Sequence, residues 1–358
     1  NPDGIMVRSA QMADYPVNDN LLAVARAGAG TNNIPSAKYA DMGITVFNTP
    51  GANANAVKEL VLCELFLGGR KITDAIEWVK TLKGTGDISK QVEKGKSKFA
   101  GGEISGATLG VIGLGAIGVL VANAAVALGM RVIGCDPYIS TANALALSPS
   151  VKLIPSRDEV YKRADFITVH VPLTPDTKNM FNADTFAKLK DGCVLINNSR
   201  GELVDTDACI AALESGKLGR YITDFPADAM IGVPNCICVP HLGASTVEAE
   251  DNCAVMAARQ LVDYIEHGNI CHGVNYPDVS MARSGAMRLC IHHKNIKEIL
   301  SKILAIVAGE GINVENMQDA SKGEYAYLLL DAGLPVSDAG IEAIRQVPGV
   351  IRVRVITG

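Results

Sequence analysis

Residues 109–118 read Leu-Gly-Val-Ile-Gly-Leu-Gly-Ala-Ile-Gly, and this stretch decides the fold of the chain. Gly113, Gly115 and Gly118 form the pattern G-x-G-x-x-G directly after an apolar run that is typical of a short strand. Such glycines allow a tight turn, a close approach of the backbone to a pyrophosphate, and close packing of a helix on the strand. An alanine-rich run at 119–128 predicts that helix, whose first amide groups would face the anion. The stretch therefore predicts a dinucleotide site.

The next predicted strand indicates which dinucleotide binds. Arg131–Cys135 is apolar and ends in Asp136, twenty-one residues after Gly115. A carboxylate at this place accepts hydrogen bonds from both ribose hydroxyls of an adenosine and would repel a 2′-phosphate. Pro137 follows, rather than an arginine that could pair with such a phosphate. We expect NAD rather than NADP.

Composition excludes several classes of function. The chain has 358 residues, a net charge of −5 and 20% charged residues, which gives no indication of a nucleic-acid or membrane partner. No apolar run approaches the ~20 residues that span a bilayer. The nine cysteines include no C-x-x-C pair, so we expect reduced thiols in a cytoplasmic protein and no metal site. The chain starts almost directly with a strand, and we expect that its natural N-terminal segment is missing.

Three blocks of composition predict three domains. Residues 1–51 and 241–282 are expected to form a substrate-binding domain, and 287–358 a separate unit. In block 52–240, apolar strands alternate with helices, which predicts a parallel sheet covered on both faces. Residues 90–98 carry four lysines and are expected to form a solvated loop. The predicted strands of the middle block are 110–112, 132–135, 166–171, 193–197, 221–224 and 237–239.

Polar residues follow three of these strands, where open parallel sheets place their ligands. Arg200 follows one strand, Asp224 and Asp228 the next, and His241 the last. A histidine can take the hydroxyl proton as hydride leaves the carbon, and a carboxylate can orient it. An arginine can hold a substrate carboxylate with two parallel hydrogen bonds. Each residue alone is also typical of a surface or loop-packing position, but together they predict hydride transfer on a 2-hydroxy acid.

The chain resembles the D-2-hydroxyacid dehydrogenase family over essentially its whole length. The resemblance implies that Arg200 binds the substrate carboxylate, that His241 is the acid/base, and that Asp224 holds the nicotinamide carboxamide. The family partner of the histidine is a glutamate followed by proline, and Asp228, in a loop one residue shorter, is the candidate here. The matching runs are Val7–Ala10, Ala27–Asn33, Val46–Gly51, Gly110–Gly118, His170–Leu173, Asn197–Gly201 and Pro240–Thr246. The expected cofactor residues are Gly113, Gly115, Ala116, Ile117, Gly118, Asp136, Pro137, His170, Val171, Pro172, Asn198, Ser199, Asp224 and Gly243.

The resemblance also implies a substrate. Within the family it points to the branch that oxidises 3-phospho-D-glycerate with NAD in the first step of L-serine synthesis, as a homodimer or homotetramer. Lys58 is expected either to add phosphate affinity or to lie on a solvated helix face. The alternatives are a glyoxylate or hydroxypyruvate reductase and a non-enzymatic, NAD-sensing corepressor. The expected substrate residues are Arg8, which would hold the phosphate, Ser9, Gly30, Asn53, Lys58, Arg200 and His241.

The last seventy residues predict a β-α-β-β-α-β order, which is ferredoxin-like. This unit resembles an ACT regulatory domain, which implies L-serine as an effector bound by His293, Asn295 and Asn313. Amide side chains suit a free amino acid, but Asn295 could equally cap a helix and Asn313 lie in a turn. The family loop Asn-x-Pro-Gly reads Asn-Ile-Lys-Glu at 295–298. The predicted fold is thus a Rossmann-type domain, an N-terminally truncated flavodoxin-like α/β domain and an ACT-like domain.

Overall fold

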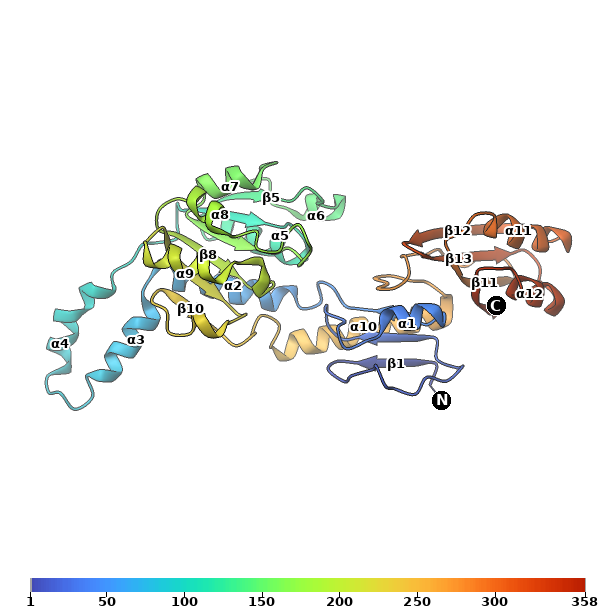
Figure 1. Ribbon diagram of the computed structural model, residues 1–358, viewed down its shortest axis with the longest axis horizontal. Helices are drawn as coiled ribbons and strands as arrows, with labels where there is room; N and C mark the ends of the chain where they lie inside the picture. Colours follow the sequence, from blue (N-terminus) through green and yellow to red (C-terminus); the bar gives the residue numbers. More distant parts are fainter. Residues whose placement is uncertain (1, 358) are drawn as a thin grey trace. The chain divides into compact units, whose positions relative to one another are not determined.

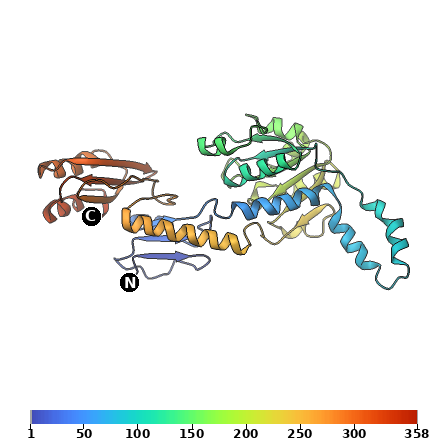
Figure 2. The same cartoon turned by 180° about the vertical axis from the view of Figure 1, so that it is seen from behind.

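The structure is a computed structural model that describes residues 2–357 (Figure 1). The chain divides into two compact units, residues 1–53 with 250–358, and residues 54–249. The sequence predicts domain boundaries at 51/52 and 240/241. The boundaries between the two units lie further along the chain, at 53/54 and 249/250. The long helix α10 (Val247–His267), orange in Figure 2, begins near the second boundary. In the following, each unit is described by itself.

The unit 54–249 is built on a seven-stranded sheet. Its strand order is β10-β9-β8-β7-β4-β5-β6, and all pairs are parallel. The order reverses between β4 and β7, which makes a crevice at the carboxyl ends of these strands. The predicted Rossmann-type sheet is therefore confirmed. The strands are β4 (Thr108–Ile112), β5 (Arg131–Cys135), β6 (Lys152–Leu153), β7 (Phe166–Val169), β8 (Cys193–Asn197), β9 (Leu218–Thr223) and β10 (Cys236–Cys238).

Alternation along the strands sends side chains into two cores, one on each face of the sheet. In β4, Val111 belongs to one core and its neighbour Ile112 to the other. Helices α2 (Ala54–Gly69) and α5 (Ala116–Ala127) cover the first face. The second face is covered by α7 (Arg157–Arg163), α8 (Ala183–Lys188) and α9 (Thr206–Glu214), while α6 (Thr141–Ala146) lies outside both cores.

An arm of two helices leaves the body of this unit (Figure 1). It consists of α3 (Ile72–Thr81), α4 (Ile88–Gly95) and the short 3₁₀ helix Lys96–Phe99. The prediction of a solvated loop at 90–98 was wrong. Asp87 caps α4 by accepting a hydrogen bond from the amide of Lys90, and the Trp78 ring packs against Phe99 at 5.2 Å between centroids.

The first part of the other unit is a three-stranded parallel sheet in the order β1-β2-β3. Its strands are β1 (Gly4–Val7), β2 (Ala23–Arg26) and β3 (Thr45–Phe47). Tyr39 of α1 (Ser36–Asp41) packs on one face. Cys253, Ala257 and Tyr264 of α10 pack on the other. The carboxyl ends of β1 and β2 thus lead into the loops that carry Arg8 and Gly30.

The C-terminal segment forms an antiparallel sheet in the order β12-β13-β11-β14, the predicted ferredoxin-like topology. One face is covered by α11 (Ile299–Gly309) and α12 (Asp338–Arg345). The helix predicted from residue 296 begins only at Ile299, because Glu298 stands in left-handed backbone (φ +66°). The strands are β11 (Met287–Lys294), β12 (Val314–Lys322), β13 (Tyr325–Ala332) and β14 (Val350–Thr357).

The other face of this sheet is not free, although we had predicted a separate domain. The buried ring of His292 in β11 lies 3.1 Å, through Nε2, from both the Thr45 hydroxyl and the Tyr264 hydroxyl. Arg352 donates hydrogen bonds to the carbonyls of Leu21 and Asp19. The C-terminal sheet and the first sheet therefore share one compact unit.

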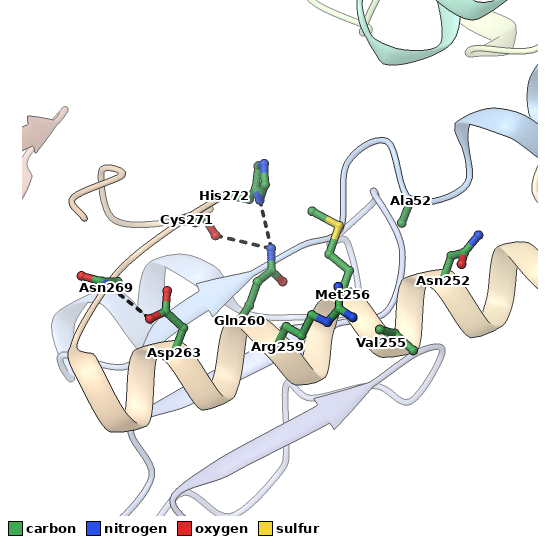
Figure 3. Close-up of a pocket in the computed structure, with 10 residues that line it drawn as sticks. All are labelled: Ala52, Asn252, Val255, Met256, Arg259, Gln260, Asp263, Asn269, Cys271 and His272. Atoms are coloured by element: carbon green, nitrogen blue, oxygen red, sulfur yellow. Dashed lines mark hydrogen bonds between the residues drawn. The ribbon is translucent and has the colours of Figure 1, made fainter. Parts of the chain in front are cut away.

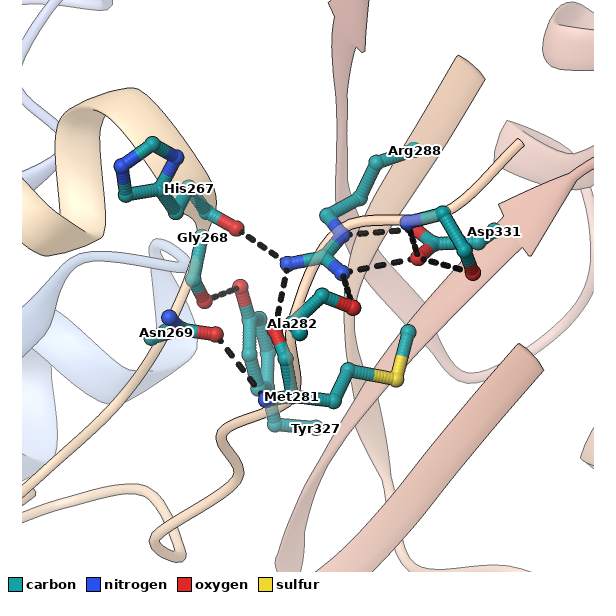
Figure 4. Close-up of polar contacts among 9 residues, drawn as sticks. His267, Gly268, Asn269, Met281, Ala282, Arg288, Tyr327 and Asp331 are labelled. Carbon is teal, nitrogen blue, oxygen red and sulfur yellow. Dashed lines mark hydrogen bonds and ion pairs between the residues drawn. The ribbon is translucent and has the colours of Figure 1, made fainter. Parts of the chain in front are cut away.

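A buried arginine of the same sheet forms an ion pair within the sheet and also reaches the end of α10 (Figure 4). Arg288 in β11 donates from Nε and Nη2 to the carboxylate of Asp331 in β13, at 2.6 and 2.8 Å. Its remaining donors reach the carbonyls of His267, Met281 and Ala282. All five N–H groups of this guanidinium are thus bonded, which offsets the loss of solvation of the buried charge.

Candidate functional site

The glycine turn after β4 has the shape that a dinucleotide requires. Gly113 has φ +91°, and a Cβ there would stand 2.3 Å from the carbonyl oxygen of His170. A Cβ on Gly118 would stand 2.0 Å from the carbonyl oxygen of Gly113. By contrast, nothing lies within 4 Å of a Cβ placed on Gly115, the N-cap of α5. The turn is closed on its protein side and open where a pyrophosphate would approach the first amides of α5.

Asp136 is fixed at the end of β5. Its Oδ2 accepts a hydrogen bond from the amide of Leu114 and its Oδ1 one from the amide of Tyr138, both at 2.8 Å. Each carboxylate oxygen can accept a further bond. The residue is therefore placed, relative to the glycine turn, where ribose hydroxyls would meet it.

Asp224 follows β9 and offers an unused acceptor. Its side chain is 1% exposed, and Oδ2 accepts a hydrogen bond of 3.0 Å from the amide of Gly243. Oδ1 is buried and has no partner within residues 2–357. Burial raises the pKa of Asp224, while the Gly243 amide and the charge of His241 oppose this shift. A buried acceptor without a donor fits an incoming amide such as the nicotinamide carboxamide, so the residues present fit NAD.

Three more polar atoms are buried without a partner in the described chain: Oε1 of Glu64 and Oδ1 of Asn198, close to Asp224, and Nδ1 of His170, next to the glycine turn. Asn198 donates to Oε2 of Glu64 at 2.6 Å. Burial raises the pKa of Glu64 to about 8 and lowers that of His170 to about 4, so both are neutral near pH 7. Our reading of the sequence missed Glu64. The signal was an acid within an otherwise apolar stretch of α2.

Phe225 lies close to both predicted catalytic side chains. The guanidinium carbon of Arg200 lies 5.8 Å from the centre of its ring, and the ring of His241 lies 4.5 Å from it. Arg200 is also held by a 2.6 Å hydrogen bond to the carbonyl of Ser199, and His241 has φ +47°. A cavity of about 700 Å³ opens beside His241, Phe225 and Asp224. Arg200 and His241 therefore lie near each other, and both lie close to Phe225, which the sequence did not indicate as a site residue.

The predicted partner of His241 is not brought into contact with it. Within residues 2–357, no hydrogen bond or ion pair joins His241 to Asp228, which lies in the short 3₁₀ helix Asp228–Met230. The carboxyl group whose pKa responds to His241 is that of Asp224. The pairing of His241 with Asp228 remains a prediction.

The predicted substrate residues fall in both units. Arg8 follows β1 and forms an ion pair of 2.8 Å with Glu250. Ser9, Gly30 and Asn53 belong to the same unit as Arg8. Lys58 lies in α2 of the other unit, 20% exposed, and donates to Asn55 at 2.6 Å. Both expectations for Lys58, phosphate affinity and a solvated helix face, remain predictions.

Of the predicted effector residues, two lie together. His293 and Asn295 line a hollow of about 300 Å³ beside Asp319 and the start of α11. His293 is already engaged, since Nε2 lies 2.9 Å from Asp319 Oδ1 and Nδ1 lies 2.9 Å from the Lys294 carbonyl. Asn313 does not line this hollow and instead donates to Glu315.

A second hollow, of about 500 Å³, follows the flank of α10 (Figure 3). Gln260 is buried there and donates to the Asn48 carbonyl, with His272 Nδ1 at 3.1 Å. None of the predicted site residues lines it. Among residues 2–357, no cluster of three metal-binding side chains is found, and no helix has the length and apolar character needed to cross a membrane.

The parallel sheet, the glycine turn with its ribose acid, and the arginine and histidine loops at the strand ends define an NAD-dependent dehydrogenase. Comparison with known proteins gives the family. Residues 70–243 match "D-isomer specific 2-hydroxyacid dehydrogenase, NAD binding domain". The chain is 31% identical to D-3-phosphoglycerate dehydrogenase of Escherichia coli, over 94% of this chain and 82% of that protein. It is 32% identical to D-3-phosphoglycerate dehydrogenase 2 of Saccharomyces cerevisiae, over 87% and 68% of the two chains.

The chain therefore belongs to the D-isomer specific 2-hydroxyacid dehydrogenases, and NAD is confirmed as its cofactor. Among solved structures, it is similar to the NAD⁺-bound 3-phosphoglycerate dehydrogenase of Entamoeba histolytica. The TM-score is 0.58 and the identity 27%, over 76% of this chain and 82% of that one. The predicted family and enzyme class are confirmed.

Proposed function

We propose that this protein oxidises 3-phospho-D-glycerate to 3-phosphohydroxypyruvate with NAD, the first step of L-serine synthesis. The observation that carries the proposal is that Arg200 and His241 both lie close to the ring of Phe225, beside the unused carboxylate oxygen of Asp224. The two phosphoglycerate dehydrogenases described above support the choice of substrate.

Each residue has a separate task in this reaction. Bound NAD supplies the hydride acceptor. Arg200 holds the substrate carboxylate, and its fixed fork orients C2 of the hydroxy acid. His241 takes the proton of the C2 hydroxyl, which allows the carbonyl to form. Asp224 accepts a hydrogen bond from the carboxamide and so fixes the face of the ring that receives the hydride.

The experiment that tests the proposal is the reverse reaction. We expect NADH oxidation with 3-phosphohydroxypyruvate to have a higher kcat/KM than with hydroxypyruvate or glyoxylate. An equal or higher kcat/KM with the small keto acids would place the protein among the reductases instead. NADH binding without any turnover would favour the non-enzymatic alternative. His241→Gln is the control, because it should retain NADH binding and lose about 10²–10⁴ in kcat.

The orienting partner of His241 is proposed to be Asp228, and the pH–rate profile tests it. If Asp228 pairs with His241 when substrate is bound, Asp228→Asn should lower kcat and shift the basic limb of the profile of the reverse reaction, in which His241 has to donate a proton. A profile like that of the unmodified protein would exclude the pair. The same measurement on Asp224→Asn separates this role from cofactor binding, since that variant should mainly raise the KM for NADH.

Two further features belong to the proposal. The arm exposes the apolar side chains of Ile76, Val79 and Ile88, which would form part of a homodimer or homotetramer interface. Ile76→Glu should then give a smaller species in size-exclusion chromatography with light scattering.

L-serine is the proposed effector of the hollow beside His293. Asn295→Ala should relieve inhibition by serine, whereas unchanged inhibition would exclude this hollow as the serine site.

A further inference from the structure

Two cysteines of the edge strand β10, Cys236 and Cys238, lie next to each other on one face of the strand. Residues i and i+2 of a strand point to the same side, and the two Sγ atoms here are 3.8 Å apart. Both side chains are half-buried, and all cysteines within residues 2–357 are free thiols. Neither thiol has a task in the proposed reaction. The sulfur atoms are close enough for a disulfide, in which they would be about 2.0 Å apart, after a small movement of the chain.

A bond between these two sulfur atoms would bend β10. Cα atoms two residues apart in a strand are separated by about 6.6 Å, whereas those of a disulfide are usually separated by about 5.5–6 Å. Closing the bond therefore draws the two Cα atoms together and shortens the strand. β10 can yield, because it has three residues and, within the described chain, a neighbour on one side only. A disulfide under such strain is easily reduced again.

The bend would reach His241, which follows β10 by three residues. The amide of Val239 donates to the carbonyl of Thr223 at 2.9 Å. The amide of His241 donates to the carbonyls of Asp224 and Val239, at 2.9 and 3.1 Å. These bonds hold His241 in left-handed backbone, with φ +47°. A shorter β10 pulls on the same bonds and so moves the backbone that carries the imidazole.

The surroundings of the pair determine how it reacts. Burial raises the pKa of Cys236, and the neighbouring thiol of Cys238 raises it further. Only the thiolate attacks an oxidant, so the pair should react slowly near pH 7. Cys209 of α9 belongs to the same cluster of thiols but is fully buried. An oxidant from solution therefore meets the pair on β10 first.

We propose that Cys236 and Cys238 form a reversible disulfide that lowers turnover by displacing His241. The inference goes beyond the proposed function and does not depend on which 2-keto acid the enzyme reduces. The oxidant is a hydroperoxide such as hydrogen peroxide. One thiolate attacks an oxygen atom, the O–O bond breaks, and a sulfenic acid and one water are formed. The second thiol attacks this sulfur, the S–S bond forms, and the sulfenic oxygen leaves as a second water. The two thiols thus lose two electrons, which reduce the peroxide.

Mass spectrometry of the tryptic peptide 221–259, together with NADH oxidation, tests the inference. Hydrogen peroxide should lower the mass of the peptide by two hydrogen atoms and lower kcat about ten- to a hundred-fold. Dithiothreitol should reverse both changes. Cys236→Ser and Cys238→Ser should each keep their kcat in peroxide and show no such loss of mass. Cys63→Ser, which removes an exposed thiol of α2, is the matched control and should respond like the unmodified protein.

Cys253 lies in the same peptide, and Cys253→Ser should still lose the two hydrogen atoms. A peptide of unchanged mass would overturn the inference. So would a disulfide that leaves kcat unchanged, or an equal loss of kcat in Cys236→Ser. Circular dichroism and NADH affinity before oxidation establish that each variant is folded. The proposed function is judged separately, from the preference of the reduced protein for 3-phosphohydroxypyruvate over hydroxypyruvate, and the mass of the peptide is read without any substrate.

Discussion

Glu64 is a carboxyl group buried in α2 beside the cofactor site, and it makes one hydrogen bond, from Asn198. Near pH 7 it keeps its proton, because burial raises its pKa to about 8. The folded state thus holds a proton that the unfolded chain releases above pH ~4.3. Stability should fall as pH rises from that value to about 8, and then level off.

Glu64→Gln should remove this dependence, because the amide oxygen can still accept from Asn198 and carries no charge. We expect a melting temperature close to that of the unmodified protein at pH 5 and clearly higher at pH 9. The difference should correspond to a few kcal/mol, at about 1.4 kcal/mol per pKa unit. Differential scanning fluorimetry checks it, with the exposed Glu59→Gln as control. An equal increase in melting temperature at pH 5 and pH 9 would contradict the raised pKa of Glu64.

The sequence predicts residues whose role is local better than residues whose role depends on folding. Gly113 and Asp136 belong to a continuous motif, so spacing alone indicated them. Phe225 became recognisable only when folding placed Arg200 and His241 close to its ring.

Among the elements, the arm shows how one glycine sets the spacing of two helices. A Cβ on Gly95 at the end of α4 would stand 2.4 Å from Cζ2 of Trp78 in α3. Trp78 is the single tryptophan of the chain, so its fluorescence reports on the arm alone.

Gly95→Val should separate the two helices and move Trp78 toward water. We expect a red shift of its emission and a local loss of about 1–3 kcal/mol, with NADH affinity unchanged, since the sheet does not depend on the arm. Gly102→Ala is the matched control, because nothing lies within 4 Å of a Cβ at that position. Unshifted emission in Gly95→Val would show that the helices do not pack in this way.

The arm is also where prediction of helices failed. Most strands of the parallel sheet were predicted to within two residues, but β9 begins three residues before its predicted start and β6 was not predicted. The strands are apolar runs between turns, a strong signal. In α4, only Ile88 and Val92 are apolar, which is too few for a clear helical pattern, and its start depends on the cap from Asp87. The start of α11 was missed for a related reason, since Glu298 has left-handed backbone without being glycine.

The ion pair of Arg288 and Asp331 connects β11 and β13 with the residues that follow α10. Burial alone would raise the pKa of Asp331, but the hydrogen bonds from Arg288 and Ser284 lower it overall. Arg288→Met should cost about 3–5 kcal/mol, because it leaves a buried charge unpaired. Hydrogen exchange of the β11 and β13 amides would measure the loss. Arg288→Met with Asp331→Leu should recover much of it, and no recovery would contradict this explanation.

At the scale of the unit formed by 1–53 and 250–358, His292 connects the two sheets. Burial, and then the charges of Arg352 and Arg354, lower its pKa well below the usual value, so the ring is neutral. The groups around it are Thr45, Tyr264, Tyr276, Tyr327, His293, Arg352 and Arg354. This connection joins residues 247 positions apart, which explains why composition suggested a separate domain.

Acid should weaken this connection. Below pH ~6.5, the unfolded chain binds a proton on this histidine that the folded state does not, so stability falls as the pH decreases. Between pH 7.5 and 5, the loss should reach at most about 1.4 kcal/mol per pH unit, and His292→Gln should remove it. Thermal melts of both proteins across this range measure the difference. If the melting temperatures of the two proteins change with pH in the same way, the ring of His292 does not stay neutral in the folded state.

The shared core around His292 has a consequence for attempts to shorten the protein. Removing residues 287–358 would uncover Tyr264, Tyr276 and Phe47, which pack in the same core as Tyr327 and Leu329 of the C-terminal sheet. A large apolar patch of this kind promotes self-association. The truncated protein should therefore precipitate on expression instead of serving as a simpler catalyst, and a soluble shortened form would need new polar side chains at those three positions.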